Sequence, residues 1–290
     1  MNLTWQAEEY LRVSRMLTKI AWANERRSEV VEKKLAFGAH PQQFLVLHYR
    51  RPPVSPDPPL IFFLHGGGWG HGNPSMFRFI GRFFAEAGYP VILGGYRLAP
   101  HDKFPHQLDD AYDGLKAGLR LAAARGLRTD SVILAGQSAG AQLASLMLLD
   151  RDRLQAHGFT QDSFAGLLLV SGLLNFAYCQ TEKDRQMLHN YLGDPAHWPN
   201  ADPIRFVRGD ERVPALCIHG ERDILVDSAN STSFISKLNH NGEIYLVPDA
   251  YHTDVTSMFL DHLPATQIML QWLARVVAEA LNHEAPTLHS

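Results

Sequence analysis

The sequence is poor in cysteine, with only Cys179 and Cys217 in 290 residues. Neither lies in a paired-thiol motif or at a zinc-ligand spacing, so no disulfide framework is predicted. We interpret Cys217, in the apolar run from Pro214 to Ile218, as a small buried hydrophobic side chain. The 15 histidines are scattered, without an HExxH motif or a cluster on one helical face. The sequence therefore predicts no metal site and no cofactor.

An excess of basic charge and long apolar runs are also lacking. Lys and Arg number 27 against 30 Asp and Glu, and the formal net charge of -3 argues against binding to nucleic acid or to an anionic membrane. Apolar runs such as Pro59 to Leu64 are far shorter than the roughly 20 residues that cross a bilayer, so no membrane insertion is expected. The amino terminus has no basic region followed by an apolar stretch, and we expect a cytoplasmic protein.

The sequence does contain regularly spaced apolar runs. From Leu60 onward, runs of strand length alternate with amphipathic stretches of helix length, a pattern typical of parallel strands covered by helices. Two shorter alternating runs upstream indicate an antiparallel pair. An α/β fold with a mostly parallel eight-stranded sheet flanked by helices is therefore predicted. The expected strands are Lys34–Phe37, Phe44–Tyr49, Leu60–Leu64, Val91–Gly94, Ser131–Ala135, Gly166–Val170, Ala215–His219 and Glu243–Val247.

The sequence predicts a single domain, residues 1–290, that includes an amino-terminal helical segment and a cap insertion. Residues 1–31 form an amino-terminal helical segment, because apolar side chains recur at helical intervals after Trp5. Residues 173–213 separate two strands by an unusually long distance and are expected to form a short cap. Apolar faces on the first and last helices would allow a homo-oligomer. The remaining expected helices are Met76–Ala87, His106–Arg125, Ala139–Asp150, Ser228–Asn239 and Pro264–Leu281.

Two glycine-rich motifs follow predicted strands. The pentapeptide GQSAG, centred on Ser138, lies between a strand and a helix, which is the context of a nucleophile elbow. HGGGW, from His65 to Trp69, follows the first long buried strand, and its glycines leave backbone N–H groups unshielded. Such groups can stabilise the oxyanion of acyl transfer. The alternative interpretation of each motif is a glycine-rich structural turn.

At these motifs the sequence resembles the esterase and lipase group of the α/β-hydrolases related to hormone-sensitive lipase, from about Leu60 to His252. The segment YRLAP at 96–100 and the downstream Asp109 and Asp110 look like the same group's structural elements. The resemblance implies an α/β-hydrolase fold. It further implies an oxyanion hole, whose expected members are Gly67, Gly68 and the N–H of Ala139, with Gly66 as a weaker candidate.

A serine nucleophile needs a histidine base and a carboxylate that orients it. His252 follows the last predicted strand, in a loop that can return over Ser138. Asp223 lies in HGERDILV, which looks like the acid loop of the family, and Asp227 is its rival because it also suits a helix cap. The order Ser, Asp, His agrees with the α/β-hydrolase arrangement. The other strand-end histidines, at 65 and 219, are expected to anchor loops through hydrogen bonds, and His240 is expected to face away.

The predicted function is a serine hydrolase that cleaves carboxylic esters of small acyl substrates through an acyl-enzyme. Two alternatives stay open: an arylformamidase, which cleaves an N-formyl amide, and a non-catalytic binding protein of the same fold. Small size of the cap favours a small ester or amide as the substrate. Its pocket is expected to be lined by Trp69, Met76, Phe77 and Trp198, although each is equally a candidate for core packing.

Overall fold

The computed structural model describes residues 14–15, 18–24, 29–51, 58–238 and 241–282. Its centre is an eight-stranded sheet in the order β1-β2-β4-β3-β5-β6-β7-β8. Strand β2 is antiparallel to both its neighbours, and all other neighbouring strands are parallel. The strands are β1 (Val31–Ala36), β2 (Phe44–Tyr49), β3 (Leu60–Leu64), β4 (Val91–Gly94), β5 (Val132–Gln137), β6 (Phe164–Val170), β7 (Ala215–Gly220) and β8 (Gly242–Val247).

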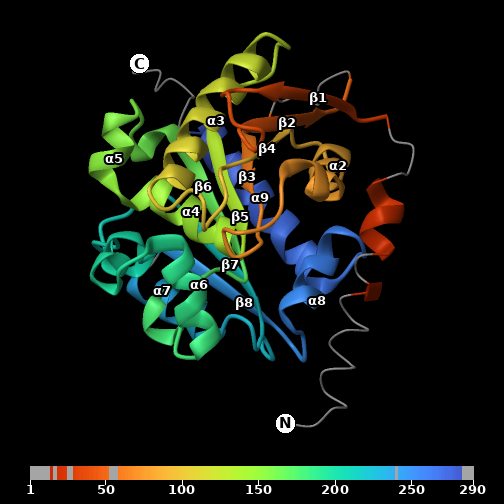
Figure 1. Ribbon diagram of the computed structural model, residues 1–290. Coiled ribbons are helices and arrows are strands. Elements are labelled where there is room, and N and C mark those ends of the chain that lie inside the picture. Colours follow the sequence, from red (N-terminus) through yellow and green to blue (C-terminus); the bar gives the residue numbers. More distant parts are fainter. Residues whose placement is uncertain (1–13, 16–17, 25–28, 52–57, 239–240, 283–290) are drawn as a thin grey trace, which may run out of the picture.

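Helices cover both faces of this sheet (Figure 1). The α-helices are α2 (Arg78–Glu86), α3 (His106–Ala123), α4 (Ala139–Leu149), α5 (Arg151–Ala156), α6 (Glu182–Leu192), α7 (Ala229–Lys237), α8 (His252–Thr256) and α9 (Pro264–Asn282). The 3-10 helices are η1 (Pro74–Phe77), η2 (Gln161–Ser163), η3 (Phe176–Tyr178), η4 (Pro195–Ala201), η5 (Pro203–Arg205) and η7 (Ser257–Phe259).

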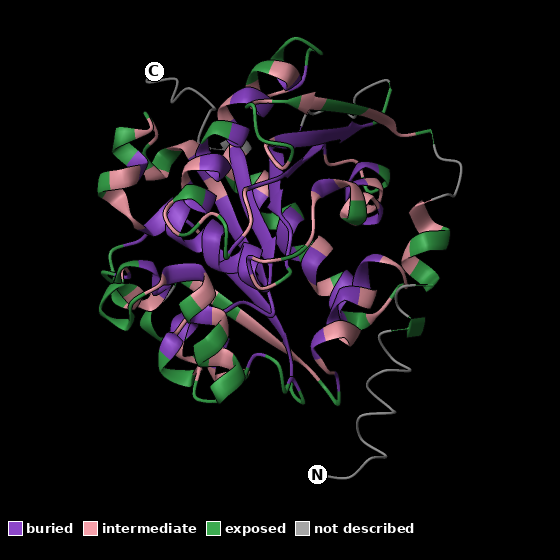
Figure 2. Cartoon of the chain, in the orientation of Figure 1, coloured by how far each residue is buried: buried purple, intermediate pink, exposed green. Residues whose placement is uncertain are grey.

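Two apolar cores lie on opposite faces of the sheet, because alternate side chains of a strand point to opposite sides. Phe62 of β3 joins the core formed with α3, α4 and α7, whereas Phe63 joins the core formed with α2, η7 and α9. The central strands are accordingly buried along their length, and exposed residues gather on the outer helices and loops (Figure 2). This double burial explains why the strands are continuous apolar runs.

The connection between β6 and β7 is the longest excursion from the sheet and contains η3, α6, η4 and η5. Leu188 and Tyr191 of α6 are fully buried in the same core as α3 and α4. Tyr191 stacks on Trp69, with ring centroids 4.0 Å apart. This excursion corresponds to residues 173–213, the segment expected to form a cap, and it packs directly on the loop that follows β3.

The predicted fold class is confirmed, and the differences from the expected elements are local. Strand β1 begins at Val31, three residues before the expected start, because Glu32 and Lys33 interrupt the apolar pattern of a strand at the sheet edge. Helix α5 was not predicted, since it is short and polar and begins at a cap where Asp150 accepts a bond from Arg153 N. Of the amino-terminal helix, 14–15 and 18–24 are helical, and the rest lies largely outside the described residues.

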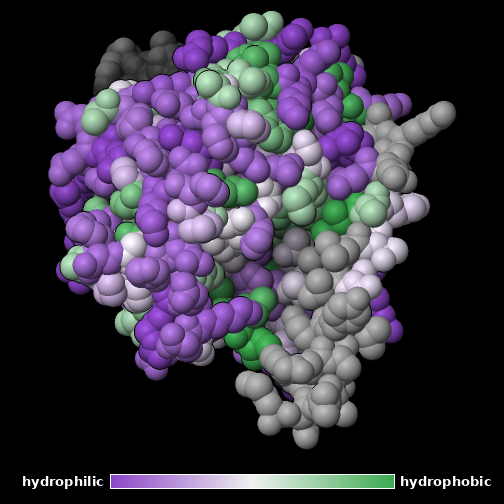
Figure 3. Space-filling model, viewed as in Figure 1, coloured by the Kyte–Doolittle hydropathy of each residue, from purple (hydrophilic) through white to green (hydrophobic). Residues whose placement is uncertain are grey.

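The face of the molecule drawn in Figure 3 is mostly hydrophilic, with hydrophobic residues in small separate groups. In the described part of the chain, no helix combines the length and the apolar character needed to span a bilayer.

Candidate active site

The parallel strands β3, β5, β7 and β8 all end at one edge of the sheet, and the loops beyond them carry the residues singled out from the sequence. In open α/β sheets this carboxyl edge is where ligands bind. Two of the loops at this edge are the glycine loop, residues 65–72 after β3, and the acid loop, residues 219–227 at the end of β7.

Ser138 lies in a tight turn between β5 and α4, with φ 55° and ψ −119°. A positive φ is unfavourable for a non-glycine residue and marks a strained position. The turn depends on Gly136 and Gly140, where an added Cβ would collide with the backbone of Gly140 and of Leu64 respectively. The Ser138 N–H donates to Val170 O at 2.8 Å, which ties the turn to β6. The geometry is that of a nucleophile elbow.

Asp223 is buried in the acid loop and receives hydrogen bonds at both oxygens. Its Oδ1 accepts from the backbone N–H groups of Leu225 and Val226, at 3.0 and 2.9 Å. Its Oδ2 lies 2.7 Å from His252 Nδ1 and 3.2 Å from His219 Nε2. Burial alone would raise the pKa of Asp223, but the bonds from His219 and His252 outweigh it and hold the pKa well below its usual range. Asp223 is therefore a carboxylate.

His252 begins helix α8, not a loop as expected from the sequence, and its ring is buried. Since Asp223 can only accept, Nδ1 carries a hydrogen, and in the neutral ring Nε2 holds the lone pair. The side-chain Nε2 of Gln137 lies 3.2 Å from this nitrogen. Asp223 and His252 are thus in direct contact, and the residue before Ser138 reaches the same imidazole.

The glycine loop turns sharply after β3. Gly67 and Gly68 have φ values of 122° and 56°, which favour glycine. At Gly67 a Cβ would also collide with the carbonyl of His71. Among the described residues, the backbone N–H groups of Gly67 and Gly68 have no hydrogen-bond acceptor. Ala139 is the first residue of α4, where the N–H has no acceptor within the helix.

His65 is fully buried at the start of the glycine loop, between the rings of Tyr96 and Phe77 at centroid distances of 4.3 and 5.6 Å. Its Nδ1 lies 2.8 Å from Gly66 O. Tyr96 in turn donates to His65 O at 2.7 Å. Burial lowers the pKa of His65 to about 4, so the ring is neutral at physiological pH. His65 anchors the loop, as the sequence predicted.

Trp69 packs the glycine loop against the cap instead of facing an open surface. Its ring has no exposed area, and its Nε1–H donates to Gln142 Oε1 at 3.0 Å. Gln142, on α4, donates from its amide to Ala201 O at 2.6 Å and accepts from the Tyr191 hydroxyl at 3.4 Å. This placement favours an anchoring role for Trp69 over the predicted contact with substrate.

The other three expected pocket residues lie apart from one another. Met76 is half-exposed in η1, Phe77 stacks on His65, and the Trp198 Nε1–H donates to Gly193 O at 3.3 Å within the cap. Their contacts with substrate stay predictions. Met187 of α6, not singled out from the sequence, lies over the glycine loop, since its Sδ would be 3.2 Å from a Cβ on Gly68.

His219 anchors the acid loop from within β7. Its Nε2 lies 2.8 Å from Val226 O as well as close to Asp223, and its Nδ1 lies 2.7 Å from Ser231 Oγ. The motif HGERD pointed to an acid loop but did not reveal that its own histidine contacts the acid. Asp227 accepts from Ala229 N at 2.8 Å and so caps α7, as its alternative role predicted. His240 lies outside the described residues.

The YRLAP segment and the aspartates downstream of it, which carry part of the family resemblance, make ion pairs away from the candidate site. Arg97 donates from Nε and Nη2 to the two carboxylate oxygens of Asp110, both at 2.8 Å. Asp109 accepts from Arg153 Nη1 at 2.6 Å. These pairs join the YRLAP segment, α3 and α5, which agrees with the structural role expected for the aspartates. In the described part of the chain, no group of three or more His, Cys, Asp or Glu could hold a metal ion.

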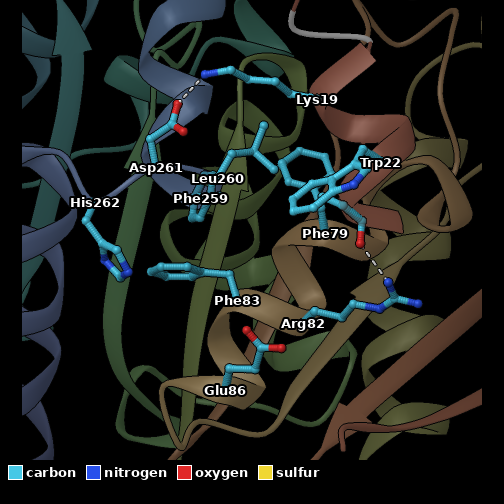
Figure 4. Close-up of a pocket in the computed structure, with 11 residues that line it drawn as sticks. Lys19, Trp22, Phe79, Arg82, Phe83, Glu86, Phe259, Leu260, Asp261 and His262 are labelled. Carbon is cyan, nitrogen blue, oxygen red and sulfur yellow. Dashed lines mark hydrogen bonds and ion pairs between the residues drawn. The ribbon is translucent and has the colours of Figure 1, made fainter. Parts of the chain in front are cut away.

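A cavity of about 280 Å³ lies on the flank of the molecule, between the helical residues 18–24, α2 and the segment after η7 (Figure 4). Trp22, Phe79, Phe83 and Phe259 contribute aromatic rings to its lining, with Phe83 and Phe259 in edge contact at a centroid distance of 5.5 Å, while Lys19 pairs with Asp261, 2.7 Å away. None of the predicted catalytic, oxyanion or substrate residues lines this cavity. It is therefore separate from the candidate active site.

The family relationship of the chain agrees with this geometry. The sequence model of a family described as alpha/beta hydrolase fold matches residues 61–253, and the chain belongs to this family. The crystal structure of an inhibited esterase B from Lactobacillus rhamnosis has a TM-score of 0.79 and covers 97% of this chain and 98% of its own. Its sequence identity is 23%, so this likeness shows the shared fold.

Two of the curated relatives match shorter segments of the chain at higher identity. A stretch of 131 residues, 45% of the chain, is 31% identical to the Oryza sativa subsp. japonica protein named "Probable isoprenylcysteine alpha-carbonyl methylesterase ICME" and covers 31% of it. A stretch of 102 residues, 33% of the chain, is 37% identical to the ethyl acetate hydrolase of Pseudomonas putida and covers 32% of it. The matched segments thus span about a third of the length of these two relatives.

Proposed function

We propose that the protein is a serine esterase that cleaves carboxylic esters of small acyl substrates through an acyl-enzyme. The observation that carries the proposal is the bond of 2.7 Å between Asp223 Oδ2 and His252 Nδ1, beside the elbow of Ser138. This bond selects the tautomer whose Nε2 can accept a proton, and the carboxylate stabilises the imidazolium that results. Membership of the α/β-hydrolase family and relatives named as ester hydrolases support the same reaction.

In the proposed reaction, Ser138 Oγ attacks the ester carbonyl while His252 Nε2 accepts the hydroxyl proton. The tetrahedral intermediate expels the alcohol, which takes that proton from the imidazolium. Water then attacks the acyl-enzyme with the same histidine as the base, releasing the acid and restoring the serine. The chain's own groups supply every proton transfer in this cycle.

The negative charge of the tetrahedral oxygen is assigned to the backbone N–H groups of Gly67, Gly68 and Ala139. The open amides of the glycine loop and the first N–H of α4 support this assignment, since donors already directed at the developing charge need no reorganisation. The amino end of α4 adds its dipole at the same point.

A small substrate is supported by the position of the cap. Met187 lies over Gly68, and α6 packs directly on the glycine loop, so the cap lies close to the atoms that would react. The relative that hydrolyses ethyl acetate acts on a small ester, as its name states. We therefore assign short acyl esters as the substrate class of this chain.

The test is labelling with a fluorophosphonate probe together with hydrolysis of p-nitrophenyl esters from acetate to decanoate. Ser138→Ala is expected to abolish labelling and to lower kcat by about 10⁴- to 10⁶-fold. Ser145→Ala is the matched control, because Ser145 is a buried serine of α4 whose hydroxyl donates to Ala141 O at 2.8 Å. Retained hydrolysis in Ser138→Ala would refute the proposal, and a preference for N-formylkynurenine over every ester would replace it with a formamidase.

A further inference from the structure

Gln137 ends β5 directly before Ser138, and its side chain is only 7% exposed. The amide nitrogen lies 3.2 Å from His252 Nε2. The amide oxygen lies against Gly66, where an added Cβ would collide with it. One side chain therefore connects the base of the proposed triad to the first glycine of the glycine loop.

The direction of the Gln137 bond follows from the tautomer of His252. Asp223 Oδ2 occupies the Nδ1–H, so the lone pair of the neutral ring is on Nε2. The group that faces this lone pair is the Gln137 amide NH₂, which can only donate. Among the described residues, the hydrogen bond of Nε2 goes to Gln137 and not to the Ser138 hydroxyl.

Ser138 must give its proton to the same lone pair when it attacks a carbonyl. An imidazole nitrogen has a single lone pair in the plane of the ring, so the two donors compete for it. We infer that Gln137 is a positioning residue which holds the resting imidazole of His252 through that lone pair, and that its amide must turn away before Ser138 can be activated. The inference rests on the proposed function.

Through its contact with Gly66, the side chain of Gln137 also touches the glycine loop, which is part of the proposed substrate site. The Gln137 amide oxygen packs against Gly66, which directly precedes Gly67 and Gly68 in the glycine loop. A hydrogen bond donated to the neutral ring also opposes protonation of the base. Gln137 therefore restrains the serine in the resting site while its side chain stays packed against the glycine loop.

In the described part of the chain, Asp223, His219 and Asp254 are the titratable groups that bear on the His252 ring. Asp223 contacts it directly, and His219 of β7 contacts it through the shared carboxylate oxygen. Asp254, on α8 itself, accepts from the backbone N–H of Tyr251 at 3.0 Å. Substitution of Gln137 leaves all three groups in place, so a change in proton transfer can be attributed to the amide.

The first measurement is the ¹⁵N NMR resonance of His252 Nε2 in the full chain, which reports whether the lone pair accepts a hydrogen bond. Gln137→Met keeps the length of the side chain and removes the donor. Gln107→Met is the matched control, because Gln107 is fully buried in α3 and its amide donates to Asp102 O. The Nε2 resonance is expected to move in Gln137→Met and to stay unchanged in Gln107→Met.

The second measurement is the rate of fluorophosphonate labelling and kcat/KM for p-nitrophenyl acetate from pH 5 to 10. At high pH, Gln137→Met is expected to label about two- to tenfold faster than the wild type, which is the factor a net neutral hydrogen bond supplies. The acidic limb of its profile is expected to move to higher pH. Gln137→Glu, with an acceptor in the same place, is expected to move that limb further.

An unchanged Nε2 resonance in Gln137→Met would overturn the inference, as would slower labelling at every pH without movement of the acidic limb. If Gln137→Met does not fold, Gln137→Glu decides by the same two readouts. The failure of the proposed function has a different signature, because wild-type protein would then leave Ser138 unlabelled. The NMR comparison would still show whether Gln137 occupies the lone pair.

Discussion

The acid loop and the glycine loop lie at the same edge of the sheet but hold their groups by opposite means. The acid loop surrounds the Asp223 carboxylate with donors from two backbone amides and from the rings of His219 and His252. The glycine loop encloses His65 between aromatic rings, and among the described residues its Nε2 has no partner. The acid loop thus holds a permanent negative charge with a full set of hydrogen bonds, whereas the glycine loop keeps its buried histidine uncharged.

The difference follows from when each loop would meet a charge in the proposed reaction. Asp223 is ionised throughout, so its burial requires hydrogen bonds that offset the loss of hydration. The glycine loop would meet a negative charge only in the tetrahedral intermediate, and its amides at Gly67 and Gly68 must stay open until then. Substitutions in the two loops and the pH dependence of stability test this contrast.

Asp223→Asn tests the role of the fully hydrogen-bonded carboxylate in the acid loop. An amide cannot stabilise the imidazolium of His252 and can stabilise the wrong tautomer, so kcat for p-nitrophenyl acetate should fall by about 10⁴-fold. The control is Asp227→Asn, which changes a carboxylate of the same loop that caps α7. Steady-state kinetics on both variants are the measurement. Equal losses in the two variants, or less than a tenfold loss in Asp223→Asn, would contradict the assignment of the acid.

The pH dependence of the unfolding free energy tests whether the buried His65 ring is kept neutral. His65 has a folded-state pKa of about 4 against 6.5 unfolded, so its contribution is complete above pH 6.5 and is lost as the pH falls through about 4. The expected loss in unfolding free energy over this window is about 3 kcal/mol. Urea unfolding of wild type and His65→Gln at each pH isolates the term, since the variant cannot titrate there. An NMR titration showing His65 protonated near pH 6 would contradict the prediction.

Gln142→Leu tests how the glycine loop is tied to the cap. The change leaves the Trp69 Nε1–H and Ala201 O without their buried partner, and the unfolding free energy should fall by about 2 kcal/mol. Tyr191→Phe is the matched control, because it removes only the 3.4 Å bond to Gln142 and keeps the ring stacked on Trp69. Denaturant unfolding of both variants is the measurement. A larger loss in Tyr191→Phe would show that the Tyr191 hydroxyl contributes more to joining loop and cap than Gln142 does.

Asp227→Ala tests the last residue of the acid loop, where α7 begins, and should change stability least. The change removes the acceptor for Ala229 N at the start of α7, which should lower the unfolding free energy by about 1 kcal/mol and leave kcat unchanged. Thermal unfolding and p-nitrophenyl acetate hydrolysis measure the two quantities. Asp227→Asn keeps an acceptor oxygen and should be nearly as stable as the wild type. A large loss of kcat in Asp227→Ala would give Asp227 the role assigned to Asp223.

Most of the sheet could be predicted because its strands are buried on both faces and appear as continuous apolar runs. The start of the antiparallel edge strand β1 was harder to predict, because β1 is paired on one side only and includes the charged residues Glu32 and Lys33. The helix at His252 was missed because it has only five residues. Short helices are stabilised by tertiary contacts more than by their own propensity.

The candidate site divides in the same way. Ser138, Asp223 and the glycine loop were found because each lies in a local motif directly after a strand. Gln137 stood inside the serine motif but gave no signal of its own, because its partner His252 is 115 residues away. Met187 belongs to the segment 173–213, which was expected to form a cap, but the sequence does not say which residues of the cap lie over the glycine loop. The burial of Trp69 under Tyr191 could not be predicted for the same reason.

By itself, the sequence determined the apolar periodicity, and with it the sheet, its covering helices and the turns that follow the strands. These features depend on steric and hydrophobic preferences that act over a few residues. Tertiary structure alone decided the partners of the buried polar groups: two histidines on one carboxylate, an amide on the catalytic candidate's lone pair, and a glutamine between loop and cap. Such pairings depend on directed bonds of about 3 Å between atoms that only the folded chain brings together.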